Sequence, residues 1–334
     1  MENNLIVTSS PHITDNSSTR KLMGQVILAL VPAFAASVLI FGTDALLLTG
    51  VTTAACVGFE FLYCLLMKKE QTVGDLSAVV TGLLLAFNLP STLPLWIALI
   101  GAFIAIVVVK QLFGGIGCNF ANPAIVARIV LAASFTGRMT KYAFPSSYAG
   151  VDALAGATPL AADLQAGNVP FLDLLLGTHG GVLGETCALA LILGGVYLIV
   201  TKVISPVIPC VYLGGYFILH FLYQFFSTFT PGATFMQNFI YAVNYSGDFA
   251  QLAAAQLLSG GILLGAFFMA TDYVTSPFTV KGKWVFGIGL AIITFAIRVF
   301  GTSAEGVSFA ILFMNLLVPY INNLTRQKPL GGKK

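Results

Sequence analysis

The chain has 334 residues, of which 57% are hydrophobic and only 9% are charged. A soluble domain carries about 25% charged residues, so this composition excludes a soluble fold and indicates a membrane protein. The net charge is only +3, and the basic residues are spread over many short loops. Nucleic-acid binding needs a clustered basic face and is therefore not expected.

About ten apolar segments are predicted to form transmembrane helices, since a helix needs about 20 apolar residues to cross the bilayer core. The N-terminal stretch is polar and lacks the apolar core of a cleaved signal peptide. Two segments, 76–89 and 121–135, are too short to cross as straight helices, and such broken helices usually line a protein cavity. The predicted spans are 22–42, 45–67, 76–89, 94–113, 121–135, 184–204, 206–227, 251–271, 284–300 and 303–320.

The basic residues predict the orientation, because cytoplasmic loops are enriched in Lys and Arg. With the N-terminus inside, the loops outside hold only Arg138 and Lys141. Both termini are then cytoplasmic, and the polar stretch 136–183 is extracytoplasmic. The residues expected inside are Arg20, Lys21, Lys68, Lys69, Lys110, Lys202, Lys281, Lys283, Arg326, Lys328, Lys333 and Lys334.

The two halves of the chain echo one another. Arg128 and Asn315 each lie 15 residues beyond the phenylalanine of a Phe-Gly pair, Phe113-Gly114 and Phe300-Gly301. Five spans per half predict an inverted repeat, with sites near the midplane between the halves. The predicted fold is thus an all-α polytopic membrane protein of two inverted five-helix repeats. Its parts are a cytoplasmic segment (1–21), a first repeat (22–135), the loop (136–183), a second repeat (184–320) and a basic tail (321–334).

The polar loop contains the stretch Asp152-Ala-Leu-Ala-Gly-Ala-Thr-Pro-Leu160. Gly156 and Ala157 leave the backbone uncluttered, and the proline that follows Thr158 disfavours a helix there. This predicts an accessible threonine hydroxyl, which needs an outside enzyme or a nearby base to be modified. The alternative is a tight turn of small residues.

A glycine-rich stretch, 114–124, contains Asn119 and Asn122 and is the densest group of polar and small residues within the membrane segments. Glycines permit close approach to a flat ligand, and the two amides offer hydrogen-bond donors and acceptors to its polar edge. Thr81 and Asn88 on the preceding short helix are expected to face the same interface. The alternative is a re-entrant turn with asparagine caps.

Three charged residues are predicted inside or at the ends of apolar segments. Glu60 and Asp272 are candidates for an ion path, because an acid at membrane depth is by default functional. The alternatives are a lysine-paired Glu60, with Lys68 about two turns on, and an Asp272 that caps a turn. Arg128 is expected either to neutralise an anionic ligand, such as a reduced cofactor ring or a phosphate, or to form a structural ion pair. The sequence contains no Cys-x-x-Cys pair, and we expect no metal site and no catalytic residue of its own.

Five stretches of the chain resemble the RnfD/NqrB family of membrane proteins. The pattern Asp-x-x-Ser/Ala-Gly-Ala-Thr at 152–158 is similar to the acceptor signature of flavin transferases, with Ala155 in place of the more usual serine. The other matches are Asn-Leu-Pro-Ser-Thr-Leu-Pro-Leu-Trp at 88–96, Gly-Gly-x-Gly-x-Asn-x-x-Asn-Pro-Ala at 114–124, Gly-Glu-Thr at 184–186 and Ala-Thr-Asp-x-Val-Thr-Ser-Pro at 270–277. The length favours the RnfD branch, because NqrB proteins carry a longer N-terminal extension.

The resemblance implies a urea-transporter-like fold and a role in an ion-translocating oxidoreductase of the bacterial or archaeal cytoplasmic membrane. Such complexes pass electrons between ferredoxin and NAD and move Na+ or H+. It further implies FMN joined covalently to Thr158 and a second, non-covalent riboflavin, which we assign to Thr81, Asn88, Asn119 and Asn122. The chain has no dinucleotide fingerprint, so the NAD and ferredoxin sites are expected on partner subunits (A, B, C, E and G). The alternatives are a quinone-reductase subunit of the NqrB type and a non-redox transporter of ions or small solutes.

Overall fold

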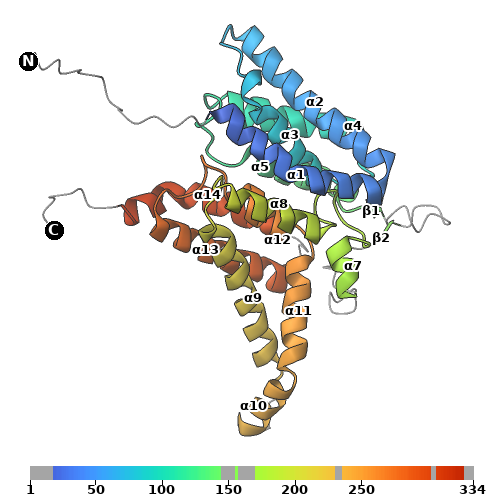
Figure 1. Cartoon of the computed structure of the whole chain (residues 1–334), viewed down its shortest axis with the longest axis vertical. Helices are drawn as coiled ribbons and strands as arrows, with labels where there is room; N and C mark the ends of the chain where they lie inside the picture. The colour runs from blue at the N-terminus through green and yellow to red at the C-terminus, as the bar shows by residue number, and fades with distance from the viewer. Residues whose placement is uncertain (1–17, 144–154, 157–169, 230–234, 302–305, 327–334) are drawn as a thin grey trace, which may run out of the picture.

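A computed structural model describes residues 18–143, 155–156, 170–229, 235–301 and 306–326. Within these ranges the regular secondary structure is helical, apart from one antiparallel pair of two-residue strands, β1 (Tyr142–Ala143) and β2 (Ala155–Gly156). The predicted all-α class is therefore confirmed. The helices of the two halves gather on opposite sides of the molecule, and α1 and α8 meet between them (Figure 1).

The N-terminal half begins with two long helices that reverse direction at Gly42. This glycine has a φ of 70°, a conformation that a residue without a β-carbon adopts at little cost. The rest of this half consists of a single 3-10 turn, a short helix, a helix whose second part is a π-helix, and two further short helices. The elements are α1 (Thr19–Phe41), α2 (Thr43–Leu66), η1 (Val73–Asp75), α3 (Ser77–Phe87), α4 (Leu95–Phe103), the π-helix η2 (Ile104–Gln111), α5 (Pro123–Ser134) and α6 (Thr136–Met139).

The C-terminal half contains a long helical extension. Helices α9 and α11 lie side by side and run away from the remaining helices, and α10 lies at their tip (Figure 1). The elements are α7 (Phe171–Leu176), α8 (Ala188–Val200), α9 (Val207–Ser227), α10 (Phe235–Asn244), α11 (Ser246–Leu258), α12 (Ile262–Leu264), the π-helix η5 (Gly265–Met269), α13 (Val280–Phe300) and α14 (Val307–Leu324).

Five helices in the described part of the chain are long and apolar enough to cross a membrane: α1, α2, α9, α13 and α14. The predicted short helices at 76–89 and 121–135 are confirmed as α3 and α5. The predicted span over 251–271 is not one straight helix, because the chain bends by 66° between α11 and α12, as in a broken span or a re-entrant loop. The protein is thus a multi-pass membrane protein whose bent and shorter apolar helices lie among longer ones.

The predicted span 184–204 is also shorter than expected, since α8 begins at Ala188 and ends at Val200. The residues before it are tied to the end of α3 instead. The Gly184 amide donates to the Phe87 carbonyl at 2.9 Å, and the Leu183 amide donates to the Leu89 carbonyl at 3.2 Å. These bonds satisfy backbone groups that a helix would otherwise satisfy, which permits irregular backbone inside the protein.

Helix α8 approaches α1 closely because small residues face each other. A β-carbon at Gly194 would overlap the carbonyl oxygen of Ala29 on α1, and one at Gly195 would overlap the Phe267 ring of η5. Small residues at such crossings let helices pack without a hydrophobic driving force between them. The contact of α1 with α8 therefore joins the two halves.

We expect Gly194→Leu to destabilise the folded chain by about 1–3 kcal/mol, because the added side chain overpacks the contact between α1 and α8. The measurement is the thermal unfolding midpoint of the detergent-purified protein. Gly214→Leu is the matched control, since a β-carbon at this exposed position of α9 has no heavy atom within 4 Å. Equal midpoints for the two variants would contradict the close packing.

Candidate functional site

A cavity of about 320 Å³ lies between the two halves. Its walls come from α1, α3, η2, the loop before α5, the end of α8, η5 and the residues after η5. This volume lies within the range of about 300–1,000 Å³ that is typical of small-molecule sites. Most of the lining is apolar, and the polar side chains are Thr19, Ser77, Thr81, Lys110, Asn119, Asn122, Thr271, Asp272 and Tyr273.

The loop before α5 supplies the asparagines of this wall. Three glycines, Gly114, Gly115 and Gly117, have φ values of 121°, 91° and 91°, which other residues rarely adopt. The loop ends where Asn122 caps α5 by accepting from the Ala124 amide at 3.1 Å, with Pro123 in the first turn as predicted. Three of the predicted cofactor residues, Thr81, Asn119 and Asn122, therefore line one cavity.

The two asparagines differ in their hydrogen bonding. Asn122 connects the halves, since its Nδ2 donates to the Met269 carbonyl at 3.4 Å. Its backbone N–H also donates to Asn315 Oδ1 at 3.2 Å when the Asn315 amide is turned to the orientation that satisfies its neighbours. By contrast, the buried Oδ1 of Asn119 has no hydrogen-bond partner among the described residues. A buried acceptor without a partner is unfavourable, so this oxygen suits a ligand that donates a hydrogen bond.

Asp272 also lines the cavity, in the turn that follows η5. Its carboxylate accepts from the Val274 amide at 3.4 Å and from Thr275 Oγ1 at 3.3 Å. The next residue, Tyr273, donates its hydroxyl hydrogen to the Val203 carbonyl. Asp272 therefore caps this turn and borders the cavity as well.

Arg128 forms a separate buried cluster outside the cavity lining. Its Nη1 donates to Asn88 Oδ1 at 2.6 Å and to Glu185 Oε1 at 3.1 Å. Asn88 in turn donates to the Leu84 carbonyl at the end of α3, at 2.6 Å. Asn88 is thus placed with Arg128 and apart from Thr81, Asn119 and Asn122. The cluster connects α3, α5 and the segment before α8.

The short strand pair brings part of the predicted flavin loop toward this cluster. Gly156 pairs with Tyr142. Burial raises the pKa of the Tyr142 phenol. The positive charge of Arg128 acts to lower this pKa, and the negative charge of Glu185 acts to raise it. Tyr142 therefore lies within electrostatic range of the arginine–glutamate pair. Asp152, Ala157 and Thr158 lie outside the described residues.

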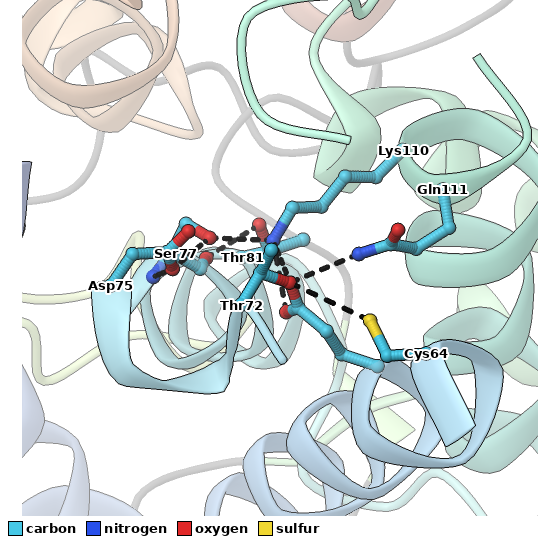
Figure 2. A network of polar contacts seen from close by, with 8 residues as sticks. Cys64, Thr72, Asp75, Ser77, Thr81, Lys110 and Gln111 are labelled. Atoms are coloured by element: carbon cyan, nitrogen blue, oxygen red, sulfur yellow. Dashed lines mark hydrogen bonds and ion pairs between the residues drawn. The ribbon is translucent and has the colours of Figure 1, made fainter. Parts of the chain in front are cut away.

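Glu60 on α2 is the centre of a second buried network (Figure 2). Its carboxylate oxygens each accept from Lys110 Nζ at 2.9 Å. Oε1 also accepts from Gln111 Nε2 at 3.0 Å and from Thr72 Oγ1 at 2.6 Å. The side chains of Glu60 and Lys110 are 0% and 2% exposed, so this is an ion pair without contact to solvent.

Lys110 lies near the end of the predicted span 94–113, on the side expected to be cytoplasmic. The structure places it in the π-helix η2, where its side chain is buried. A lysine partner is one of the alternatives expected for Glu60, with Lys68 as the candidate. The structure shows Lys110 as the partner, whereas Lys68 is exposed. The third donor contact of the ammonium is Ser77 Oγ at 2.5 Å, and Ser77 in turn donates to Asp75 Oδ1 at 2.6 Å.

No group of three or more His, Cys, Asp or Glu side chains that could hold a metal ion occurs among the described residues. The polar atoms of the site belong instead to amides, hydroxyls and two ion pairs. Such a set can bind a neutral or charged organic ring and can carry a monovalent cation, but it provides no ligand cluster for a transition metal.

A family model described as the NQR2, RnfD, RnfE family matches residues 6–331. The chain belongs to this family. The resemblance carried by the motifs at 114–124, 152–158, 184–186 and 270–277 is therefore confirmed.

Named relatives match over nearly their whole length. A protein of Acetobacterium woodii, named as the D subunit of a Na+-translocating ferredoxin:NAD+ oxidoreductase complex, is 42% identical over 100% of this chain and 97% of its own. A Clostridium ljungdahlii protein, named as the D subunit of a proton-translocating ferredoxin:NAD+ oxidoreductase complex, is 36% identical over 100% and 98%. A Stutzerimonas stutzeri protein, named as the D subunit of an ion-translocating oxidoreductase complex, is 36% identical over 94% and 93%.

Two residues of the site were not identified as such from the sequence. In the sequence, Glu185 is recognised only as part of the Gly-Glu-Thr motif, and Lys110 only as one of the basic residues expected on the cytoplasmic side. Each is a charge in or beside an otherwise apolar run, which is the signal that could have identified them. Their partners are 57 and 50 residues away in the sequence, so the pairing itself was not visible.

We expect Lys110→Met to destabilise the chain by about 3–5 kcal/mol, because it leaves the Glu60 carboxylate buried without a counter-charge. The double variant Glu60→Gln/Lys110→Met should recover most of this loss, because neither charge remains. Thermal unfolding of the two variants and of Lys68→Met, the exposed control, measures the effect. A double variant no more stable than Lys110→Met alone would contradict the assigned pair.

Proposed function

We propose that this chain is the D subunit of an Rnf-type, ion-translocating ferredoxin:NAD+ oxidoreductase. The supporting observation is the match over the whole chain to proteins named as the D subunits of such complexes. The A, B, C, E and G subunits are the proposed partners, and they would supply the NAD and ferredoxin sites. The chain itself would act as an electron relay in the bacterial or archaeal cytoplasmic membrane.

The first proposed electron carrier is FMN joined to Thr158 through a phosphodiester. The sequence Asp152 to Thr158 supports this, and Gly156 and Ala157 leave room for the transferase. The pairing of Gly156 with Tyr142 favours a flavin ring close to Arg128, whose positive charge would stabilise a negatively charged ring or the phosphate. When bound, a flavin supplies one- and two-electron chemistry whose potential depends on nearby hydrogen bonds and charges.

The second proposed carrier is a non-covalent riboflavin in the cavity between the halves. The unpartnered Asn119 Oδ1 can accept from the N3–H of an isoalloxazine ring, and Thr81 and Asn122 add polar groups to the same wall. The apolar remainder of the lining suits a flat aromatic ring. Asn88 lies in the Arg128 cluster, which favours a role at the first flavin over one at the second.

Glu60 and Asp272 remain the proposed residues of the ion path. Glu60 is an acid buried within a membrane helix, and Asp272 is a half-buried acid that follows η5 and borders the cavity. The proposed ion is Na+ or H+, because one relative is named as part of a Na+-translocating complex and another as part of a proton-translocating complex. We place both termini in the cytoplasm and the loop 136–183 outside, with the repeats at 22–135 and 184–320, on the distribution of basic residues.

A second candidate function is a transporter without redox chemistry, which the cavity between bent and short helices favours. A quinone-reductase subunit of the NqrB type is the third, because the family model covers it as well. The mass of the intact chain distinguishes the flavin-carrying Rnf subunit from the transporter. The subunits that co-purify with the chain distinguish the Rnf subunit from the NqrB-type subunit.

The intact mass of the denatured chain from its native membrane should exceed the sequence mass by one FMN phosphodiester. We expect the increment to map to the peptide that contains Thr158 and to be lost in Thr158→Ala. Thr140→Ala, a threonine at the end of α6 outside the signature, is the matched control and should keep it. An unmodified wild-type chain from native membrane would overturn the flavin relay and favour the transporter.

Asn119→Leu should weaken non-covalent riboflavin binding by up to about tenfold, since one hydrogen bond contributes about 0.5–1.5 kcal/mol. Riboflavin is released by denaturation and measured against the covalent FMN, which should stay unchanged. Asn323→Leu on the exposed face of α14 is the control. Equal riboflavin contents in both variants would contradict the assignment of the cavity.

A further inference from the structure

We propose that Lys110 is a shared counter-charge, which neutralises Glu60 and moves toward the cavity when an anionic ligand occupies it. Glu60 then takes up a monovalent cation or a proton in place of the ammonium. Lys110 would thus act as a positioning residue that couples the cavity ligand to the ion path. This inference rests on the proposed function, because it takes the cavity as a ligand site and Glu60 as part of the ion path.

The position of Lys110 between two sites carries the inference. Its ammonium contacts both carboxylate oxygens of Glu60, and the residue also lines the cavity. Ser77 provides the link, because its Oγ accepts from the ammonium and the residue itself lines the cavity. A lysine has a flexible four-carbon stem and a compact charge, so it can exchange partners within a short distance.

The charges of the cavity indicate the class of ligand. Lys110 and Asp272 are the charged residues that line it in the described part of the chain. An anionic ligand is therefore attracted toward the Lys110 wall and repelled from Asp272. A flavin ring that becomes negative on reduction has the required chemistry.

The surroundings of Glu60 determine how its carboxylate responds when the ammonium leaves. Its other contacts, Thr72 and Gln111, are neutral, and no second cation contacts it among the described residues. A buried carboxylate without a counter-charge is strongly unfavourable, so it must bind a cation or a proton. The oxygens of Glu60, Thr72 and Gln111, whose amide can rotate, are hard ligands of the kind that Na+ prefers.

The exchange leaves the total charge unchanged, since the ligand brings one negative charge and the entering ion brings one positive charge. No covalent bond forms or breaks apart from the uptake of a proton from water in the H+ case. By linkage, the cation at Glu60 must strengthen binding of the anion by the same factor as the anion strengthens binding of the cation.

Labelling of Glu60 by dicyclohexylcarbodiimide tests the exchange, because this apolar reagent adds to protonated buried carboxyls. The sample is the complex purified from its native membrane, in lipid nanodiscs at neutral pH with added riboflavin and without Na+. The Glu60 peptide is quantified by mass spectrometry before and after reduction with dithionite. Lys110→Met and the matched exposed control Lys68→Met are treated in the same way.

We expect little labelling of oxidised wild type and at least about a fivefold rise on reduction, the lower end of typical coupling between sites. Lys110→Met should be labelled strongly in both states, and Lys68→Met should behave as wild type. Suppression of the rise by Na+ would support exchange with Na+, and a rise that Na+ leaves intact would support exchange with a proton.

Equal labelling of oxidised and reduced wild type would overturn the inference, whatever the stability of the variants. A chain without FMN by intact mass is a different outcome, which concerns the proposed flavin relay alone. Because riboflavin is added to every sample, the labelling result stands in either case.

Discussion

The ion pair between Arg128 and Glu185 is the contact at which the broken helices of both halves meet. Arg128 extends from α5 to Asn88 at the end of α3, and Glu185 precedes α8. A β-carbon at Gly261, in the bend between α11 and α12, would overlap Glu185. Inside a membrane, interrupted helices persist only where other protein groups satisfy the freed polar atoms. The cavity between the halves depends on these interruptions.

The apolar runs predicted most helices of this fold because hydrophobicity over 20 residues is a local property. The same reasoning predicted Asn122 and Pro123 at the start of α5. It missed the bend after α11 because the interrupting residues, Ser259 to Gly261, are themselves small and compatible with a span. It also missed the pair of Glu60 and Lys110, because contacts across 50 residues depend on tertiary packing.

The two buried ion pairs have different structural roles. Arg128 and Glu185 form hydrogen bonds with the ends of helices and hold irregular backbone in place. The hydrogen bonds of Glu60 and Lys110 described above are all with other side chains and not with helix ends. Replacing such a pair by apolar residues is often neutral or stabilising in proteins. Its presence beside a cavity therefore favours a function over a contribution to stability.

The π-helix η2 fixes the directions in which consecutive side chains point. In an α-helix neighbouring residues diverge by about 100°, yet Lys110 and Gln111 both contact the carboxylate of Glu60. A π-helix is in effect an α-helix with an added residue, often at a functional site. Loss of one residue between Ile104 and Val109 would keep every polar side chain of the network in the sequence and still turn Lys110 away from Glu60. The length of this segment is therefore as much a part of the site as its chemistry.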